Sequence, residues 1–519
     1  MRLSVDRDVK RLFDNPVVLP LVVLGMVVVG GILRLVVARQ DLFGDELATY
    51  WVVSTRGVRG VVETVSTTAE ITPPLSFVLS WLTTRLGRSP ELVRLPALVA
   101  GIAAIPLVYA VGTRTVGRSA AVLGAALTTL SPFMIFYSAE ARGYGLLMGL
   151  LLLSTLALLL AIDTGHTGWW VLYGLCVCLA AYTHYTAVFV LVGQLGWAVW
   201  AHPPARRPAL IATAVAALLY LPWMPSVKGD VDSPTTDILS AFSPLTLDGT
   251  RLTLGHWTVG FPYGGPTRSM SDLPGMPALL LLAVSLGLGA YGIFTMRSRL
   301  KEWFAPNHGR IVLILVLALA TPVGSLLQSA VGANVFSTRS LAASWPYLAL
   351  AVAALITVGR PVLRLTAAAL AVTALAIGAA MMTQERFHRP DYTALAQLAA
   401  DHPGAVVVDG AAFTPGPLTN FDVESSSPGV PIFRLSVPAQ MTKPFGVGEQ
   451  PPDPAVVAAQ AIAAADGGPI IVMAGLYGGP PLEQFVDLLP EGYELTDHTE
   501  IHGLFDLQAQ VYQQTDAEG

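Results

Sequence analysis

Long apolar runs dominate this sequence, and they recur from Val17 to Met382. A bilayer core about 30 Å thick requires roughly 20 apolar residues for each helix that crosses it. The chain is 519 residues long, and 53% of them are hydrophobic while only 13% are charged. That composition carries more apolar surface than a water-soluble domain can bury. The sequence therefore predicts a polytopic α-helical membrane protein.

We predict about eleven transmembrane helices from these runs. They are Val17–Ala38, Arg94–Val111, Ala120–Tyr137, Leu146–Ile162, Trp169–Thr183, Val188–Trp200, Ala209–Trp223, Pro277–Met296, Arg310–Ala330, Leu341–Val358 and Val362–Met382. The first run follows several basic residues, as the apolar core of a signal peptide does. Its length and the lack of a small-residue cleavage site favour a retained anchor.

The arginines orient these spans, because cytoplasmic loops carry an excess of Lys and Arg. A cytoplasmic N-terminus places four basic groups on the cytoplasmic side: Arg114 with Arg118, Arg206 with Arg207, Arg297 with Arg299 and Lys301, and Arg360 with Arg364. This arrangement requires Thr72–Leu86 to lie at the outer surface as a juxtamembrane helix. The rival count makes that segment a span and puts Arg114 and Arg118 outside, and we rank it second.

The predicted topology divides the chain into two domains. Residues 1–383 form a transmembrane domain with external loops 39–91 and 225–275, and residues 384–519 form a small extracytoplasmic α/β domain. In that second domain Ala405–Asp409 and Pro469–Met473 have the pattern of buried strands. Its predicted helices are Tyr392–Ala400, Pro454–Ala465 and Leu482–Leu488, and the Pro- and Gly-rich stretch Phe413–Pro431 predicts turns or loops.

Two chemistries are disfavoured by composition. The net charge is -5, and no basic stripe follows the length of a phosphate backbone, so we do not expect nucleic-acid binding. The two cysteines, Cys176 and Cys178, lie two residues apart in an apolar helix and point to different faces. Buried small side chains are the better interpretation of both.

A short acidic turn follows the first apolar run, with the sequence Phe43-Gly44-Asp45-Glu46-Leu47. Two adjacent carboxylates at the exit of a span are well placed for acid–base chemistry on a lipid-linked substrate. The alternative is that the pair caps a juxtamembrane helix, because carboxylates favour its positive N-terminal end.

Several short motifs occur along the chain in an order that is more specific than any one of them. They are Gly44-Asp45-Glu46, Thr72-Pro73-Pro74-Leu75, Arg94-Leu95-Pro96-Ala97, Ser138-Ala139-Glu140-Ala141-Arg142-Gly143-Tyr144, Thr183-His184-Tyr185, Leu221-Pro222-Trp223 and Ser337-Thr338-Arg339-Ser340-Leu341. In this order the chain resembles the polytopic GT-C glycosyltransferases over roughly Leu33 to Tyr347. Within them it looks like the bacterial branch related to protein O-mannosyltransferases and the lipid A aminoarabinose transferase (glycosyltransferase family 39-like).

The resemblance implies a membrane-embedded fold, an outward-facing active site and an inverting transfer from a polyprenyl-phosphate sugar. It also implies that an acidic residue of the first external loop acts as the base, and Asp45 matches that position. A carboxylate there can take the proton that the acceptor hydroxyl loses as it attacks the anomeric carbon. We expect Glu46 to have a supporting role, holding an Arg or the sugar, because neighbours on a helix point in different directions.

The polyprenyl phosphate gains charge as it leaves, so fixed cations would stabilise the transition state. The candidates are Arg339, Arg142 and Arg34, and Arg339 is favoured because it matches the family's phosphate-contacting Arg. Family members often have Tyr where Ser340 stands. The alternative for Arg142 is an ion pair with neighbouring Glu140, and the alternative for Arg34 is snorkelling to the headgroups.

We expect sugar or acceptor contacts from Glu70, Glu140, Tyr144, His184 and Tyr185. A solvated surface carboxylate is the alternative for Glu70. Many relatives place His before the Pro pair where Thr72 stands, which removes one candidate group. A hydrogen-bonded structural role is the alternative for His184.

The sequence does not announce a metal site, since the nine His are dispersed and the external acids do not alternate as oxygen ligands do. We therefore expect no required cofactor, with a divalent cation as the alternative because some GT-C relatives bind one.

The expected partners are a polyprenyl-phosphate sugar donor, an envelope glycan, glycolipid or protein acceptor, and membrane lipid. The expected location is the bacterial plasma (inner) membrane. Two rival functions are a transporter or lipid flippase with charges near mid-span, and a non-catalytic envelope scaffold.

Overall fold

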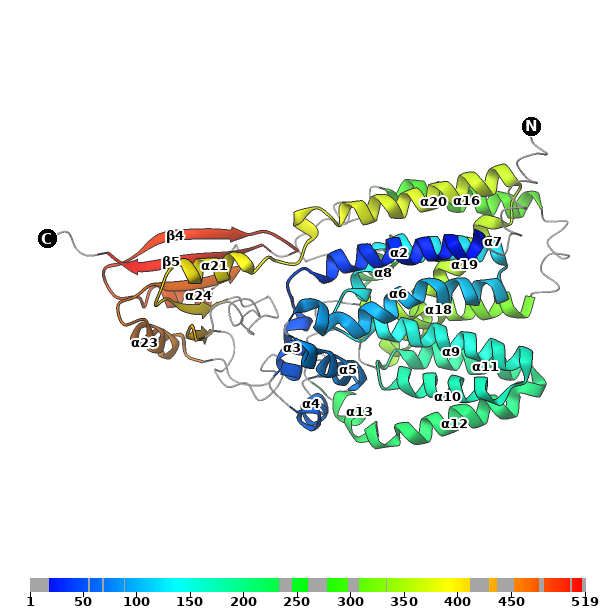
Figure 1. The fold of residues 1–519 in the computed structure, drawn as a ribbon, viewed down its shortest axis with the longest axis horizontal. Coiled ribbons are helices and arrows are strands. Elements are labelled where there is room, and N and C mark those ends of the chain that lie inside the picture. The colour runs from blue at the N-terminus through cyan, green and yellow to red at the C-terminus, as the bar shows by residue number, and fades with distance from the viewer. Residues whose placement is uncertain are drawn as a thin grey trace.

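Two regions of different architecture lie end to end in the computed structural model (Figure 1). One is a bundle of long apolar helices, and the other is a small α/β domain built from the C-terminal part of the chain. The structure describes residues 18–54, 57–67, 70–87, 89–231, 233, 245–259, 278–296, 308–332, 334–410, 429–435, 452–475, 480–504 and 506–515.

Each of the eleven predicted spans coincides with helix in the bundle. The helices are α2 (Val18–Ala38), α6 (Pro90–Thr115), α7 (Arg118–Leu130) with α8 (Pro132–Ser138), α9 (Tyr144–Thr164), α10 (Thr167–Ala181), α11 (Ala187–Ala201), α12 (Arg206–Tyr220), α16 (Leu279–Thr295), α18 (His308–Val331), α19 (Trp345–Thr357) and α20 (Pro361–Met381). Within the described residues seven helical segments are long and apolar enough to cross a bilayer, or eight if the bent pair α7–α8 is one span. A multi-pass membrane protein is confirmed, and the count of eleven stays a prediction.

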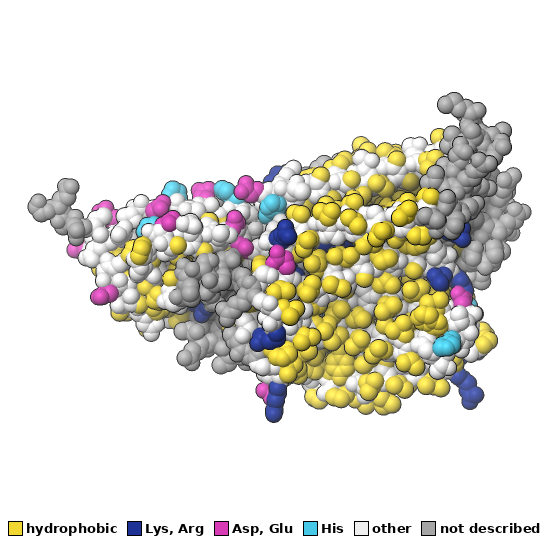
Figure 2. All heavy atoms as spheres, in the orientation of Figure 1, with side chains coloured by type: hydrophobic (Ala, Val, Ile, Leu, Met, Phe, Trp, Pro, Cys, Tyr) yellow, Lys and Arg dark blue, Asp and Glu magenta, His cyan; other side chains and the backbone are white. Residues whose placement is uncertain are grey.

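The surface of the bundle fits a bilayer environment. Figure 2 shows apolar side chains over its visible face, with charged side chains gathered toward its two ends. Exposed leucines and isoleucines on α2 and α12, such as Leu21, Ile32, Ile211 and Leu218, contribute to this belt. The visible face of the α/β domain is instead rich in acidic and polar side chains (Figure 2). The belt therefore ends near the junction of the two regions.

The segment predicted as the first external loop folds into short helices at the end of the bundle nearest the α/β domain (Figure 1). These are α3 (Asp45–Ser54), α4 (Val58–Val65), α5 (Leu75–Thr83) and the 3-10 turn Thr84–Leu86. Their apolar side chains form a small core in which Val53, Val61 and Phe77 are buried with Trp223. Helix α5 has nine residues, far fewer than the roughly 20 that a span needs. That length agrees with the predicted juxtamembrane helix and not with the rival span.

The second external loop contributes α13 (Met224–Val231) and α15 (Leu247–Val259). Much of the rest of the predicted loop 225–275 lies outside the described residues. The predicted turns in Phe413–Pro431 also fall almost entirely outside them. Cys176 and Cys178 are buried and not bonded.

The α/β domain contains a five-stranded sheet with the order β2-β1-β3-β5-β4. Its strands are β1 (Val406–Asp409), β2 (Ile432–Arg434), β3 (Ile470–Gly475), β4 (Tyr493–Ile501) and β5 (Leu507–Gln514). Strands β2, β1 and β3 are parallel, while β5 and β4 are antiparallel. The predicted strands correspond to β1 and β3, whereas β2, β4 and β5 are not predicted from the sequence.

Helices cover both faces of this sheet because alternate strand residues point to opposite sides. Val407 and Ile471 pack with α21 (Thr393–Asp401) on one face. Val406, Val408 and Ile470 pack with α23 (Pro454–Ala465) and α24 (Pro480–Val486) on the other. All three helices lie where they were predicted, with ends shifted by at most two residues.

Candidate active site

Four carboxylates and four arginines meet at the junction between the bundle and the α/β domain. They are Asp45, Glu46, Glu70 and Glu140, with Arg94, Arg142, Arg339 and Arg389. Gly44 adopts a positive φ of 61°, a conformation that glycine reaches without a Cβ clash. This turn separates α2 from α3 and places both acids in the first turn of α3.

Glu46 is buried and fully hydrogen-bonded. Its Oε1 and Oε2 accept bonds from Arg94 Nε and Nη2 at 2.6 and 2.7 Å, and Arg389 Nε lies 2.8 Å from Oε2. The backbone N–H of Ala141 donates to Oε1 at 2.8 Å. Glu46, Arg94, Arg389 and the Ala141 N–H are called the buried anchor below. Burial raises the pKa of Glu46, but the two guanidinium charges outweigh it and leave that pKa lowered.

Asp45 has the opposite environment, since 20% of its side chain is exposed. Its Oδ2 accepts a hydrogen bond from Arg339 Nη1 at 2.8 Å, and Arg142 Nε lies 4.0 Å from the same oxygen. Asp45, Arg339 and Arg142 are called the open half below. Consecutive helical residues point in different directions, so only one carboxylate of the adjacent pair faces this accessible position.

Arg142 pairs with Glu70, not with the neighbouring Glu140. Its Nη1 and Nη2 donate to the two Glu70 oxygens at 3.0 and 2.8 Å, the parallel geometry that favours Arg–carboxylate recognition. Thr72 Oγ1 donates to Glu70 and accepts from Arg142 Nη2 at 3.0 Å. Burial lowers the pKa of Arg142, but Glu70 and Asp45 raise it further than burial lowers it. The alternative of a solvated Glu70 is wrong, because its side chain is 3% exposed.

Glu140 lies in the same turn and is also buried. Within the part of the chain that the structure describes, its Oε2 has no hydrogen-bond partner. Burial, and after it the charge of Glu46, raises the pKa of Glu140 to about 8. Glu140 is therefore close to the other acids of the cluster without a cation of its own.

The aromatic candidates divide into two groups. The Tyr144 ring lies 5.2 Å from the His184 ring, centroid to centroid. His184 Nδ1 accepts the backbone N–H of Thr186 at 3.2 Å. Burial, followed by the charges of Arg142 and Arg339, lowers the pKa of His184 to about 3, so this ring is neutral. Tyr185 instead donates its hydroxyl proton to Asp230 of α13, so it belongs to a different hydrogen-bond network.

Arg34 lies outside the cluster. It is buried between α2 and α7, where Nη2 donates to the Thr128 carbonyl at 2.9 Å and Nη1 donates to the Thr129 carbonyl at 3.3 Å. Pro132 follows four residues after Thr128 and has no N–H to donate to that carbonyl, and the α7–α8 pair bends there by 62°. Arg34 therefore bonds the carbonyls of a broken helix end and does not snorkel to the headgroups, because its side chain is fully buried. Its contact with the donor phosphate stays a prediction.

Two members of the buried anchor were absent from the predicted site. Arg94 was noted only as part of a motif, although a fully buried Arg at the end of an apolar run requires a carboxylate partner. Arg389 follows the last span and reaches back to the turn before α9, where Nη2 donates to the Ala139 carbonyl at 3.0 Å. Beside it, the Tyr392 N–H donates to Asp41 Oδ2 at 2.6 Å. The start of the α/β domain is thus bonded to the first external loop.

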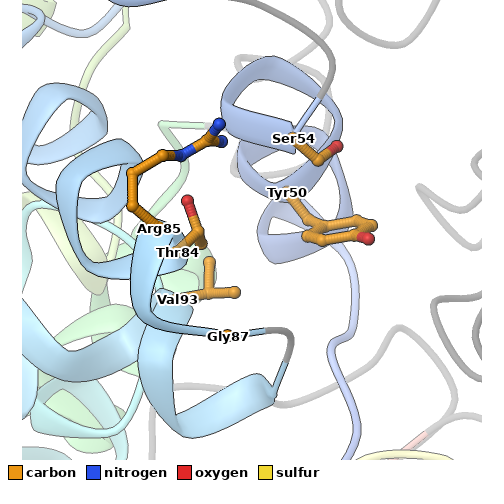
Figure 3. A pocket seen from close by; sticks show the side chains of 6 residues that line it. All are labelled: Tyr50, Ser54, Thr84, Arg85, Gly87 and Val93. Atoms are coloured by element: carbon orange, nitrogen blue, oxygen red, sulfur yellow. The ribbon is translucent and has the colours of Figure 1, made fainter.

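A cavity of about 210 Å³ lies on another side of α3. Figure 3 shows its lining, with Arg85 and Thr84 on one wall and side chains of α3 on the other. The lining residues are Tyr50, Ser54, Thr84, Arg85, Gly87 and Val93. Arg85 Nη2 donates to the Val53 carbonyl at 3.0 Å. None of the predicted site residues is among these lining residues.

Among the described residues no three His, Cys, Asp or Glu side chains come together as a candidate metal site. Three of the four acids in the cluster are instead bonded to guanidinium groups. The chemistry that this arrangement offers is that of an accessible carboxylate beside fixed cations. Metal independence stays a prediction.

Comparison with known proteins agrees with the predicted resemblance. Residues 71–225 match the family model described as dolichyl-phosphate-mannose-protein mannosyltransferase. Two solved structures of ArnT from Cupriavidus metallidurans superpose with a TM-score of 0.54 each. The apo form is 13% identical, and the match covers 96% of this chain and 98% of that chain. The form bound to undecaprenyl phosphate is 12% identical, with 95% and 97% covered.

This chain has the GT-C fold. An oligosaccharyltransferase from Archaeoglobus fulgidus superposes with a TM-score of 0.50 at 11% identity, over 96% of this chain and 75% of that one. No curated protein sequence matches significantly. The GT-C likeness to ArnT extends beyond the predicted limits of Leu33 to Tyr347, because it includes nearly all of the chain and hence the α/β domain.

Proposed function

We propose that this protein is an inverting glycosyltransferase that moves a sugar from a polyprenyl-phosphate donor to an acceptor outside the cytoplasm. The observation that carries the proposal is the open half, in which a partly exposed carboxylate lies 2.8 Å from one guanidinium and 4.0 Å from another. The matched family model and the ArnT structure with undecaprenyl phosphate support the donor class. The acceptor is an envelope glycan, glycolipid or protein.

Asp45 is the proposed base. The acceptor oxygen attacks the anomeric carbon while an Asp45 oxygen takes the hydroxyl proton, and the bond from that carbon to the phosphate oxygen breaks with its electron pair on the phosphate. One displacement on the face opposite the leaving group inverts the anomeric configuration. Glu46 cannot act as a second base, because both of its oxygens already accept hydrogen bonds from the buried anchor.

Arg339 is the proposed phosphate ligand, and Arg142 supports it. Arg339 side-chain exposure is 29%, against 8% for Arg142, so Arg339 is the more accessible guanidinium. A phosphate on Arg339 competes with Asp45 for the same nitrogen, and an Asp45 oxygen released from that bond accepts the acceptor proton more readily. Arg142, held by Glu70, supplies a fixed positive charge that stabilises the leaving phosphate. Tyr144 and neutral His184 border the site and are proposed sugar contacts.

The proposed setting is a bacterial plasma membrane with the N-terminus in the cytoplasm. Helix α2 runs toward the α/β domain and α20 ends beside it (Figure 1). The cluster and the α/β domain therefore share one side of the bilayer, which we assign to the extracytoplasmic face from the arginine distribution.

Transfer by an Asp45→Asn protein tests the proposal. Mass spectrometry of lipids that copurify with the wild-type protein first identifies the donor headgroup. Wild-type and D45N proteins in proteoliposomes are then given that donor, and the release of polyprenyl phosphate is measured. We expect D45N to lose about 10²- to 10⁴-fold in rate, the usual contribution of a positioned base. Asp248→Asn on exposed α15 is the matched control. A folded D45N protein with full activity would exclude Asp45 as the base.

A further inference from the structure

Glu140 is the one acid of the cluster whose place in the chemistry is not yet assigned. It lies in the turn between α8 and α9 that also supplies the Ala141 N–H to Glu46 and the Arg142 guanidinium to Glu70. Its side chain is 5% exposed, and in the described part of the chain Oε2 makes no hydrogen bond. Buried polar atoms are nearly always paired, so this oxygen needs an explanation.

The charged groups around Glu140 come from three segments. Asp45 and Glu46 face it from α3, Arg389 faces it from the segment before α21, and Arg142 belongs to its own turn. The uncharged Tyr144 phenol faces it from the first residue of α9. Arg389 is bonded to Glu46, and Arg142 is bonded to both oxygens of Glu70. The nearby cations are therefore matched to other carboxylates, and an ionised Glu140 would be a buried charge beside two like charges. Such a charge is costly, and a carboxyl in this position takes up a proton instead.

Protonation of Glu140 raises the net charge of the cluster by one elementary charge. Four carboxylates and four guanidinium groups cancel when all are ionised. His184 is neutral and adds nothing. A proton on Glu140 leaves these eight side chains with a net charge of +1. The phosphate of a polyprenyl-phosphate sugar is a diester with a single negative charge, and it matches that surplus.

We propose that Glu140 is a positioning residue that holds a proton while the donor binds, so that the cluster carries one positive charge for the donor phosphate. This inference rests on the proposed function. Burial raises the pKa of Glu140 to about 8, so the protonated form prevails at neutral pH and is lost as the pH rises through 8. Affinity for an anionic headgroup therefore falls over the same range, because Glu140 becomes a fourth negative charge.

The test compares wild-type protein with Glu140→Gln, which fixes a neutral side chain of the same shape. Both are placed in nanodiscs of zwitterionic lipid, and binding of undecaprenyl phosphate is measured at pH 7 and pH 9. We expect wild-type affinity to fall about tenfold, the effect of one unit above a single pKa. We expect E140Q to bind like wild type at pH 7 and to keep that affinity at pH 9. Any titration of the probe itself affects both proteins equally.

The control is Glu63→Gln, which removes an exposed carboxylate of the same external region and should follow the wild-type curve. Parallel curves for wild type and E140Q would overturn the inference, as would weak binding by E140Q at pH 7.

If E140Q does not fold, calorimetry of undecaprenyl phosphate binding to the wild type at pH 8.5, in buffers of different ionisation enthalpy, tests the inference instead. We expect uptake of more than half a proton on binding, and no uptake would refute the inference. Wild-type protein that binds no undecaprenyl phosphate at pH 7 contradicts the proposed function itself.

Discussion

The buried anchor and the open half differ sharply, although Glu46 and Asp45 are adjacent in the sequence. Glu46 is 1% exposed and is held by two arginines and a backbone N–H. Asp45 is 20% exposed and has one close guanidinium partner. The saturated carboxylate holds segments together, whereas the accessible one retains a lone pair for a substrate. The difference teaches that chemical type and sequence position do not separate a structural acid from a reactive one, and that hydrogen-bond saturation does.

Replacing Glu46 by Gln is expected to have the largest effect on stability. It leaves Arg94 and Arg389 buried without a carboxylate, and breaking a buried pair from one side costs about 3 to 5 kcal/mol. The measurement is the thermal unfolding midpoint in detergent, with Asp45→Asn as the control that should unfold within a few degrees of wild type. Equal destabilisation by the two substitutions would remove the distinction between anchor and open half.

Replacing Glu46 by Gln should also change how the unfolding midpoint depends on pH. The folded-state pKa of Glu46 lies below its ordinary value of 4.5, so the ionised anchor stabilises the fold above about pH 4.5. That contribution is lost as the pH falls below 4.5 and through the lowered pKa. Wild-type unfolding midpoints should therefore drop on acidification more steeply than those of E46Q. Superimposable pH profiles would contradict this assignment.

Arg339→Gln should chiefly affect catalysis. Loss of one charged donor at a developing anion typically costs about 10²-fold in rate, and removal of this partly exposed side chain leaves the anchor bonds intact. Transfer kinetics are the measurement, and Arg251→Gln on exposed α15 is the matched control. An R339Q protein with wild-type kcat and KM would show that the donor phosphate lies elsewhere.

Thr72→Val tests how Arg142 is held within the open half, and its expected effect is smaller. Thr72 Oγ1 bonds both Glu70 and Arg142, and one lost hydrogen bond to charged groups costs about 1.5 to 3 kcal/mol. We expect roughly tenfold slower transfer through a less well held Arg142. Thr72→Ser keeps the hydroxyl and should restore the rate, so a T72S protein as slow as T72V would point to packing instead.

Chelation should have the smallest effect. A guanidinium group is the proposed phosphate ligand in place of a metal cation, so we expect transfer to survive EDTA unchanged. The assay is release of polyprenyl phosphate before and after chelation. Loss of activity that magnesium, manganese or calcium restores would show that the open half is completed by a metal.

Much of the helical bundle could be predicted because its signals are local. An apolar run long enough to span a bilayer, or a Gly-Asp-Glu turn after it, is visible in one stretch of sequence. The same holds for α23, which begins at a proline preceded by an Asp cap. Strand β4 was missed because its side chains are mostly exposed and polar, and only its pairing with β5 makes it a strand.

The partners within the site could not be predicted from spacing. Glu140 and Arg142 are two residues apart in the sequence, which suggests an ion pair between them. Side chains at that separation do not face each other on a regular helix. Arg142 pairs with Glu70 instead, a residue 72 positions earlier in the chain. Arg389 joins Glu46 only because the segment after α20 folds back onto the first external loop. The bonds from Arg34 to the Thr128 and Thr129 carbonyls could not be predicted, because the α7–α8 break that leaves those carbonyls available is visible only in the structure.

The bond between Arg389 and Glu46 has a consequence for biosynthesis. Glu46 and Arg94 are synthesised early and pair with each other, but Arg389, the second guanidinium on Glu46, follows the last long helix of the bundle. Glu46 therefore lacks its second guanidinium partner until the ribosome has delivered about three-quarters of the chain. A protein truncated before Arg389 would keep the long helices of the bundle and lose one of the two guanidinium groups that hold the Glu46 carboxylate.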